Sequence, residues 1–237
     1  MRKYQQSGLN WLTFLSRVNL GACLADDMGL GKTVQLLAFL TNDQEANKSK
    51  NATKNASLLI LPASLITNWI NEINRFAPDL NTLVAHSSGD LNNGKTSFSS
   101  SELDAYDLVI TTYTLVKISE WIKRYRWNLI ILDEAQAIKN PGSQQTKAIK
   151  SLEANHRIAM TGTPIENRLS DLWSLFGFLN PGLLGNAKEF SNYTKRLKDN
   201  PEGYKRFKKV IQPFILRRIK TDLSIISDLP EKVEMKT

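Results

Sequence analysis

The chain is poor in the residues that form cross-links and metal sites, with one cysteine and two histidines among 237 residues. The lone Cys23 excludes an internal disulfide, and its apolar neighbours indicate a small buried side chain rather than a reactive thiol. His86 and His156 are far apart and have no cysteine partners, which argues against a structural zinc site. We recognise no secretory signal and no apolar run near the roughly 18 residues that a membrane span needs. We therefore expect a cytoplasmic protein with no membrane partner.

Basic residues exceed acidic ones, and the excess is concentrated toward the C-terminal end. The formal net charge is +8, and an excess of the same size lies between residues 191 and 220, where only Asp199 and Glu202 are acidic. Such a segregated stretch suits a polyanion partner, although a solvated helix face would have the same composition. The basic residues of this stretch are Lys195, Arg196, Lys198, Lys205, Arg206, Lys208, Lys209, Arg217, Arg218 and Lys220.

Apolar runs of strand length alternate with helical patterns through residue 160. The runs are 21–25, 57–61, 82–85, 107–111, 129–132 and 156–160. Helical periodicity fills most of the intervals, at 32–40, 65–76, 113–123 and 143–152. Because the runs are apolar on both faces, the pattern predicts an α/β fold whose mainly parallel sheet is covered by helices on both sides. The polar segment 41–57, rich in Asn, Lys and Ser, predicts a surface loop.

Beyond residue 170 the pattern predicts helices and no further strand. Residues 190–218 are expected to form a helical outgrowth from the sheet domain. We therefore expect a sheet domain at 1–180 and a basic helical extension at 181–220. The first helix of this part has an apolar face made of Leu172, Trp173, Leu175, Phe176 and Leu179.

A glycine-rich turn, DDMGLGKT, follows the first apolar run and opens a helix. Gly29 and Gly31 allow the backbone to curl so that its N–H groups face the phosphates of a nucleotide. Lys32 would neutralise phosphate charge and Thr33 would reach Mg²⁺, while the helix N-terminus favours the anion. Asp26 stands where the usual phosphate-loop pattern has its first glycine. The predicted nucleotide-binding residues of this turn are Asp27, Met28, Gly29, Leu30, Gly31, Lys32 and Thr33.

Two adjacent acids, Asp133 and Glu134, stand at the end of the apolar run 129–132. Open α/β sheets bind ligands at the carboxyl ends of their strands, so these acids should meet the glycine-rich turn. Asp133 would hold Mg²⁺, directly or through water, and Glu134 would orient and deprotonate the attacking water in phosphoryl transfer. Acids favoured by the dipole of a helix N-terminus are the alternative interpretation. The two motifs together favour a site for ATP and Mg²⁺.

Seven segments in the expected order resemble the motifs of the Swi/Snf-type DNA-dependent ATPases, the helicase-like motors of chromatin remodellers and their prokaryotic relatives. The chain departs from the usual pattern at Asp27, where members mostly carry Glu, and at Gln136, where many carry His. The resemblance covers nearly the whole chain. The matching segments are MRKYQQSGLNWL at 1–12, DDMGLGKT at 26–33, LPASLITNW at 61–69, VITTY at 109–113, LDEAQAIKN at 132–140, MTGTPIEN at 160–167 and PFILRR at 213–218.

The resemblance implies a role for each matching residue. Gln5, with Tyr4 and Arg2 nearby, would bind the adenine edge. Gln136 would bridge to the third motif, and we expect Trp69 to be a core residue. The implied catalytic residues are Lys32, Glu134 and Gln136. The residues implied to approach duplex phosphates or to relay the nucleotide state are Ser64, Asn68, Thr111, Thr112, Thr161, Gly162 and Thr163.

The implied function is the first RecA-like lobe of a double-stranded-DNA translocase, which binds ATP, Mg²⁺ and the DNA backbone without sequence specificity. Residues 221–237 would lead toward a second lobe that carries arginine fingers. Because such arginines contribute roughly 10³–10⁵ in rate, we expect this chain to hydrolyse ATP very slowly by itself. In a prokaryote the protein would be nucleoid-associated. The alternative is a nucleotide-switched binding module that acts on a DNA-bound protein such as RNA polymerase.

Overall fold

The structure is a computed structural model that describes residues 1–49, 55–86, 97–162, 169–197 and 201–222. The described strands form one seven-stranded sheet in the order β3-β4-β2-β5-β6-β1-β7, and every pairing is parallel. The parallel α/β fold predicted from the alternating runs is confirmed. The strands are β1 Ala22–Leu24, β2 Ser57–Leu61, β3 Thr82–Val84, β4 Leu108–Thr112, β5 Trp127–Leu132, β6 Ala154–Met160 and β7 Ile215–Leu216.

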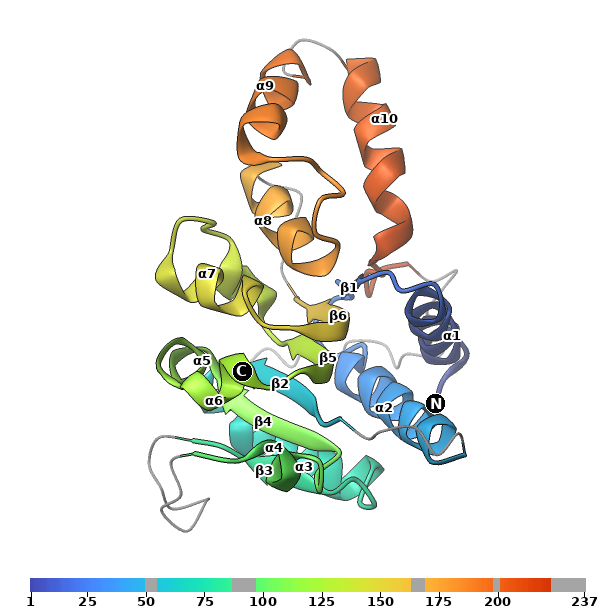
Figure 1. Cartoon of the computed structure of the whole chain (residues 1–237). Helices are drawn as coiled ribbons and strands as arrows, with labels where there is room; N and C mark the ends of the chain where they lie inside the picture. The colour runs from blue at the N-terminus through green and yellow to red at the C-terminus, as the bar shows by residue number, and fades with distance from the viewer. Residues whose placement is uncertain (50–54, 87–96, 163–168, 198–200, 223–237) are drawn as a thin grey trace, which may run out of the picture.

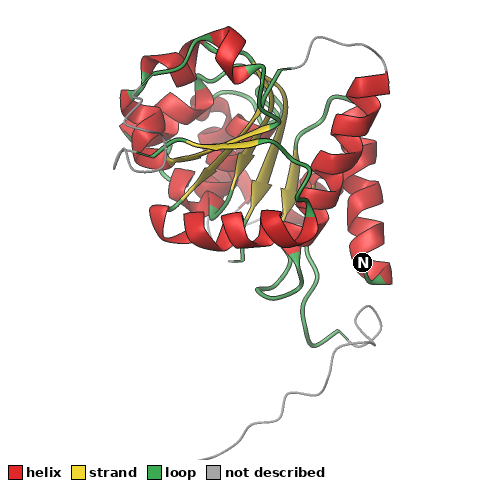
Figure 2. Ribbon diagram, turned by 90° about the horizontal axis from the view of Figure 1, so that it is seen from below, coloured by secondary structure: helices red, strands yellow, loops and turns green. Residues whose placement is uncertain are grey.

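Helices cover both faces of this sheet, as Figures 1 and 2 show. The helices with their bounds are α1 Lys3–Arg17, α2 Lys32–Ser49, α3 Ile66–Phe76, α4 Ser100–Leu103, α5 Tyr113–Ile118, α6 Glu120–Arg124, α7 Gln144–Lys150, α8 Leu169–Leu179, α9 Ala187–Leu197 and α10 Pro201–Ile211. Short 3₁₀ turns are η1 Ala63–Leu65, η2 Ala135–Ile138 and η4 Gln212–Phe214. No helix within the described ranges is both long and apolar enough to cross a bilayer.

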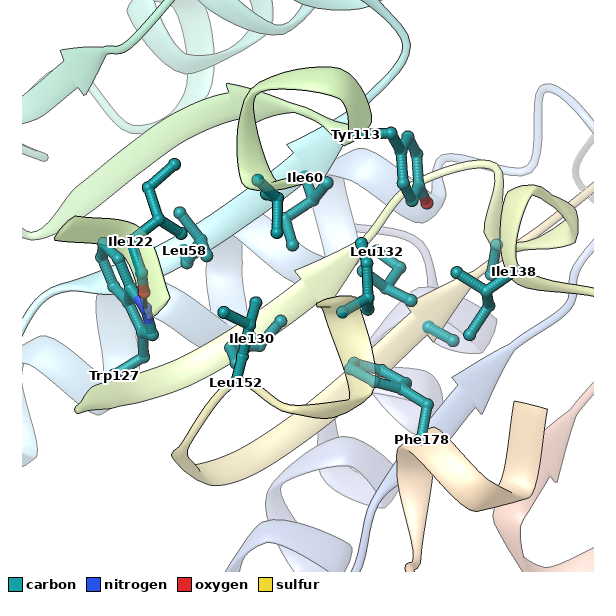
Figure 3. Close-up of a cluster of buried hydrophobic side chains, with 14 of the residues drawn as sticks. Leu58, Ile60, Tyr113, Ile122, Trp127, Ile130, Leu132, Ile138, Leu152 and Phe178 are labelled. Carbon is teal, nitrogen blue, oxygen red and sulfur yellow. Dashed lines mark hydrogen bonds between the residues drawn. The ribbon is translucent and has the colours of Figure 1, made fainter. Parts of the chain in front are cut away.

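Two hydrophobic clusters pack on opposite faces of the sheet because strand side chains alternate between faces. In β5, Ile130 and Leu132 belong to the cluster that α5, α6, α7 and α8 cover, which Figure 3 shows. Leu129 and Ile131 of the same strand belong to the cluster beneath α1, α2 and α3. Each fully buried aliphatic side chain contributes about 1.5–3 kcal/mol, so this doubly apolar strand anchors the residues that follow it.

The helices after the sixth strand form a third cluster at one end of the molecule. Leu172 and Phe176 of α8 pack with Phe190 of α9 and Phe207 of α10. Figure 1 shows α9 and α10 standing away from the sheet, so the helical outgrowth predicted from the sequence is present. The boundaries of the division at residues 180 and 220 stay a prediction.

Three local predictions are wrong. The chain does not leave the sheet after β6, because the two-residue strand β7 pairs with β1 through Ile215 opposite Cys23. The segment predicted as one helix at 113–123 is two helices, since Ser119 between them has extended backbone angles. Residues 41–49 continue α2 instead of forming a loop. A tertiary contact supports this extension: the side-chain amide of Asn128 donates to Asp43 over 2.8 Å.

Candidate functional site

The glycine-rich turn connects β1 to α2 at the carboxyl edge of the sheet. Gly29 and Gly31 have φ angles of +81° and +73°, a left-handed conformation that glycine adopts without strain. A Cβ at Gly31 would also lie 2.4 Å from Nε2 of Gln5. The turn therefore has its tight curl because these positions lack side chains.

The ammonium group of Lys32 lies inside the turn. Its Nζ donates to the carbonyl oxygens of Asp26, over 2.6 Å, and of Asp27, over 3.3 Å. Burial lowers the pKa of Lys32 from its usual value, while the charges of Asp26, Asp133, Glu134 and Asp27 act to raise it. The lysine and the two acids after β5 lie at the same edge of the parallel sheet, and their roles stay a prediction.

The carboxylate of Asp133 is held by a hydrogen bond to each oxygen. The indole Nε1 of Trp69 donates to Oδ2 over 2.8 Å, and the backbone N–H of Glu134 donates to Oδ1 over 2.9 Å. The backbone N–H of Asp133 continues the sheet by donating to the Ile60 carbonyl over 2.9 Å. Burial raises the pKa of Asp133, and these two hydrogen bonds and the charge of Lys32 act to lower it. Each carboxylate oxygen can still accept a further bond or bind a cation.

Glu134 has a left-handed backbone, with φ 51° and ψ 54°. For a residue with a side chain this conformation costs on the order of 1–3 kcal/mol, and such strain is common at functional sites. Its Oε2 accepts a hydrogen bond from Nε2 of Gln136 over 2.6 Å. The Oε1 atom of Gln136 in turn accepts from the Thr161 hydroxyl over 3.0 Å. The bridge predicted between Gln136 and the third motif is therefore formed.

The third motif also touches the phosphate loop. A Cβ at Gly162 would lie 2.8 Å from Cγ of Met28 and 3.8 Å from Nζ of Lys32. Any side chain at this position would have to displace the loop residue that packs over it. The predicted relay residue Thr163 lies outside the described residues.

Helix α1 contacts the phosphate loop through Tyr4 and Gln5, two of the three residues predicted to bind adenine. The Tyr4 hydroxyl and Nε2 of Gln5 both donate to the Leu30 carbonyl, over 3.2 and 3.3 Å. The Oε1 atom of Gln5 accepts from the backbone N–H of Arg2 over 2.9 Å at the start of the helix. The Gln5 amide keeps one N–H and one lone pair for a ligand. Contact with adenine stays a prediction for these three residues.

Sequence reasoning missed a buried ion pair between Asp26 and Arg218. Their side chains are 0% and 6% exposed and are joined by an Nη2 contact and by Nε donating to Oδ1 over 2.9 Å. The guanidinium also donates to Oε1 of Gln35 over 2.6 Å and to the Tyr4 carbonyl. Arg218 is thus not one of the solvent-facing charges of the basic stretch, which corrects that expectation. The departure of Asp26 from the usual glycine was the sequence signal for a buried cation.

The segment after β7 lies along the phosphate loop. The Ala25 N–H donates to the Leu216 carbonyl over 2.7 Å, and the Asp27 N–H donates to the Arg218 carbonyl over 2.9 Å. The Lys220 N–H donates to Oδ2 of Asp27 over 3.1 Å. These bonds extend the β1–β7 ladder into the loop, so the loop is supported on its outer side.

The residues predicted to approach DNA phosphates differ in exposure. Ser64 on η1 and Asn68 on α3 are exposed. Thr111 is fully buried, and its hydroxyl has no hydrogen-bond partner among the described residues. The Thr112 hydroxyl accepts the Leu115 N–H over 3.3 Å and caps α5. The burial of the Thr111 hydroxyl argues against a direct phosphate contact by this side chain. Contact of these four residues with DNA stays a prediction.

The residues at this edge suit a nucleotide with Mg²⁺. Lys32 and the loop N–H groups suit phosphates, and Thr33, half-buried in the first turn of α2, has a hydroxyl for the metal. The described residues contain no cluster of three acidic, histidine or cysteine ligands. Mg²⁺ does not need one, because it is usually held by one or two carboxylates together with substrate phosphates and water. The donor set with Asp133 fits that pattern.

Comparison with known proteins gives a consistent result over almost the whole chain. The SNF2-related domain family matches residues 4–237. YwqA of Bacillus subtilis, a protein named for ATP-dependent helicase or translocase activity, is 41% identical over 240 residues, covering 100% of this chain and 25% of YwqA. TATA-binding protein-associated factor MOT1 of Saccharomyces cerevisiae is 37% identical over 255 residues, covering 98% of this chain and 13% of MOT1. The chain thus spans a quarter or less of the length of these relatives.

Solved structures with the same fold come from an archaeon. The Swi2/Snf2 ATPase core of Sulfolobus solfataricus in complex with double-stranded DNA is 43% identical, with a TM-score of 0.85. The match covers 97% of this chain and 46% of that one. A second structure of the same core domain has a TM-score of 0.80 and covers 96% of this chain. Similarity at this level shows that the two proteins share the fold of this lobe.

Proposed function

The chain belongs to the SNF2-related family, and from this membership we propose that it is the ATP-binding first lobe of a double-stranded-DNA translocase. The observation that supports the proposal most directly is that Lys32 lies in the phosphate loop after β1, while Asp133 and Glu134 follow β5 at the same edge of the parallel sheet. These are the groups that a triphosphate and its metal require. The archaeal core that matches this chain was solved on duplex DNA, which supports DNA as the partner.

In the proposed mechanism the residues of this chain bind the nucleotide phosphates, orient the attacking water and accept a proton from it. Lys32 turns from the loop carbonyls to the phosphates, and the loop N–H groups hold them. Thr33 and Asp133 would hold Mg²⁺, which would supply charge neutralisation for the phosphate oxygens. Glu134 orients and deprotonates water, with its carboxylate positioned by Gln136. Arg2, Tyr4 and Gln5 border the adenine.

We propose that the remaining side of the site comes from a second lobe, reached through residues 221–237. The chain covers 25% of YwqA, so most of that relative lies outside the matched part. Arginines supplied by another lobe contribute roughly 10³–10⁵ to phosphoryl-transfer rates. Turnover by this chain is therefore expected to be very slow, while nucleotide binding is expected to be measurable.

Replacing Lys32 tests the proposed site. Binding of mant-ATP to the purified chain, followed by fluorescence anisotropy, should weaken about 10- to 100-fold in Lys32→Ala, because the charge-assisted hydrogen bond to the phosphates is removed. Lys139→Ala, at an exposed position beyond the acidic pair, is the matched control and should bind as the wild type does. Equal affinity in the wild type and Lys32→Ala would remove the phosphate loop from its proposed role.

A second function is favoured by one relative. MOT1 is named as a factor associated with TATA-binding protein, so a motor of this family can be linked to a protein target. We propose as the alternative that the nucleotide switches binding to a DNA-bound protein such as RNA polymerase. The two functions differ in their salt response. Duplex binding through phosphate contacts should fall steeply as salt rises, whereas a protein-directed module need not bind free duplex.

A further inference from the structure

We propose that Trp69 and Tyr113 are positioning residues of the nucleotide site, which fix the carboxylate and the main chain of Asp133 for metal binding. This inference rests on the proposed function, because that function assigns Mg²⁺ to Asp133. Neither aromatic residue would touch the nucleotide in this arrangement. Each acts through a single hydrogen bond to Asp133, one to its side chain and one to its backbone.

Trp69 fixes the orientation of the carboxylate. The residue lies on α3, is 3% exposed and packs in the cluster beneath α1, α2 and α3. Its indole Nε1 crosses from that cluster to Oδ2 of Asp133 over 2.8 Å. Trp11, Trp127 and Trp173 instead donate their indole N–H to backbone carbonyls. Because Oδ1 of Asp133 is held by the Glu134 N–H, the two donors together define the plane of the carboxylate.

Tyr113 fixes the main chain at the same residue from the opposite face of the sheet. It begins α5 directly after β4, is 6% exposed, and its hydroxyl donates to the Asp133 carbonyl over 2.7 Å. Figure 3 shows its ring between α5 and the end of β5, near Leu132. A tyrosine hydroxyl has an ordinary pKa of about 10, so it carries its proton at neutral pH and donates this bond.

If Trp69 and Tyr113 served only to fill the hydrophobic clusters, their indole N–H and hydroxyl groups would not be needed. Phenylalanine in place of either residue would keep a ring in the hydrophobic cluster but remove the hydrogen bond. With Trp69 replaced, Oδ2 would lose its protein donor and the carboxylate could rotate about χ2. Residues that orient a metal ligand commonly change metal affinity about 10- to 100-fold when replaced. The loss should appear in Mg²⁺-dependent binding and not in nucleotide binding without metal.

The test compares mant-ADP affinity in Mg²⁺ and in EDTA. Trp69→Phe and Tyr113→Phe should each weaken the Mg²⁺-dependent affinity about 10-fold and leave the affinity in EDTA within about twofold. Trp173→Phe is the matched control for the indole, since Trp173 of α8 donates its indole N–H to the Gly185 carbonyl. Tyr125→Phe is the control for the hydroxyl, because Tyr125 is buried and donates to Asp104 away from the site. In both controls the ratio of the mant-ADP affinity in Mg²⁺ to that in EDTA should equal the wild-type ratio.

A second test uses NMR spectroscopy and does not require a measurement of nucleotide affinity. The ¹⁵N-indole resonance of Trp69, identified by its absence in Trp69→Phe, should shift when ADP and Mg²⁺ are added together and shift less with ADP alone. If Trp69→Phe does not fold, the same resonance is identified in the wild type by its change in Asp133→Asn. An indole resonance that ignores Mg²⁺, together with unchanged affinity ratios in both variants, would overturn the inference. Absence of any mant-ADP binding by the wild type would instead overturn the proposed function.

Discussion

Asp26 and Arg218 form a buried ion pair at the start of the phosphate loop. Removing two charges from water costs several kcal/mol per ion, and only good geometry with additional hydrogen bonds offsets that cost. Here the carboxylate also accepts from the Arg218 backbone N–H over 3.0 Å, and Gln35 donates to its second oxygen over 3.3 Å. The guanidinium lies 5.1 Å from the centroid of the Tyr4 ring, a cation–π arrangement. Arg218 thus connects α1, α2 and the loop between β1 and α2 through its hydrogen bonds.

Breaking this pair on one side should destabilise the fold. Arg218→Met leaves the Asp26 carboxylate buried without its partner, so the free energy of unfolding in urea should fall by about 3–5 kcal/mol. Arg217→Met is the matched control, because Arg217 is the exposed neighbour and surface changes usually stay within about 0.5 kcal/mol.

A double variant separates the ion pair from packing. Asp26→Leu combined with Arg218→Met removes both charges, and its loss of stability should be smaller than the sum of the two single losses. Strict additivity in this cycle would show that the two side chains do not interact in the folded protein.

At the scale of elements, α8 is attached to β1 by reciprocal hydrogen bonds. The Gly21 N–H donates to Oδ1 of Asn180 over 2.8 Å, and Nδ2 of Asn180 donates to the Gly21 carbonyl over 3.2 Å. A Cβ at Gly21 would lie 2.3 Å from the backbone carbonyl oxygen of Leu179. Because that obstacle is backbone, it cannot be relieved by a side-chain rotation. The end of α8 can approach β1 this closely only because residue 21 is glycine.

Adding one methyl group at this junction should weaken the fold. Gly21→Ala is expected to lower the free energy of unfolding by about 1–3 kcal/mol, since α8 must move away from β1. Gly142→Ala is the control, because a Cβ there would meet Oδ1 of Asn140 at 3.4 Å, an ordinary contact. Thermal unfolding followed by circular dichroism would compare the two variants. Wild-type stability in Gly21→Ala would mean that the contact between α8 and β1 is looser than described.

At the scale of the whole molecule, positive charge gathers on the helices that stand away from the sheet. Arg206, Lys208 and Lys209 of α10 and Lys195 and Arg196 of α9 are exposed. Phe190 and Phe207 hold these two helices together on their inner side, so the charged side chains face solvent. Such an arrangement suits a polyanion, in agreement with duplex DNA as the proposed partner.

The basic outgrowth should contribute to salt-dependent DNA binding. In Lys208→Gln/Lys209→Gln the slope of log Kd against log salt should fall by about 0.9 for each DNA phosphate that these lysines no longer neutralise. Fluorescence anisotropy with a labelled duplex of arbitrary sequence would measure the slope. Lys123→Gln on α6, a lysine paired with Glu120, is the control and should leave the slope unchanged. An unchanged slope in the double variant would favour the other interpretation, a solvated helix face.

The sequence by itself determined the sheet and the residues at its edge. Apolar runs such as 57–61 and 129–132 must be buried on both faces, and a parallel sheet covered by helices meets that requirement. The site residues could also be recognised from their neighbours in the sequence, because Lys32 follows a glycine turn and Asp133 follows an apolar run. Motif order then indicated the family. Local pattern was sufficient here because an apolar run and a glycine turn can be recognised from residues close together in the chain.

Only the tertiary structure decided what joins distant segments. Strand β7 has two residues and no periodicity of its own, so its pairing with β1 depends on a partner 192 positions away. Trp69 was expected to be a core residue, and it is, but its bond to Asp133 depends on how α3 packs on the sheet. Thr111 was expected to approach DNA, and its side chain is fully buried. Such contacts have no periodic sequence signature, because they form between residues that only folding brings together.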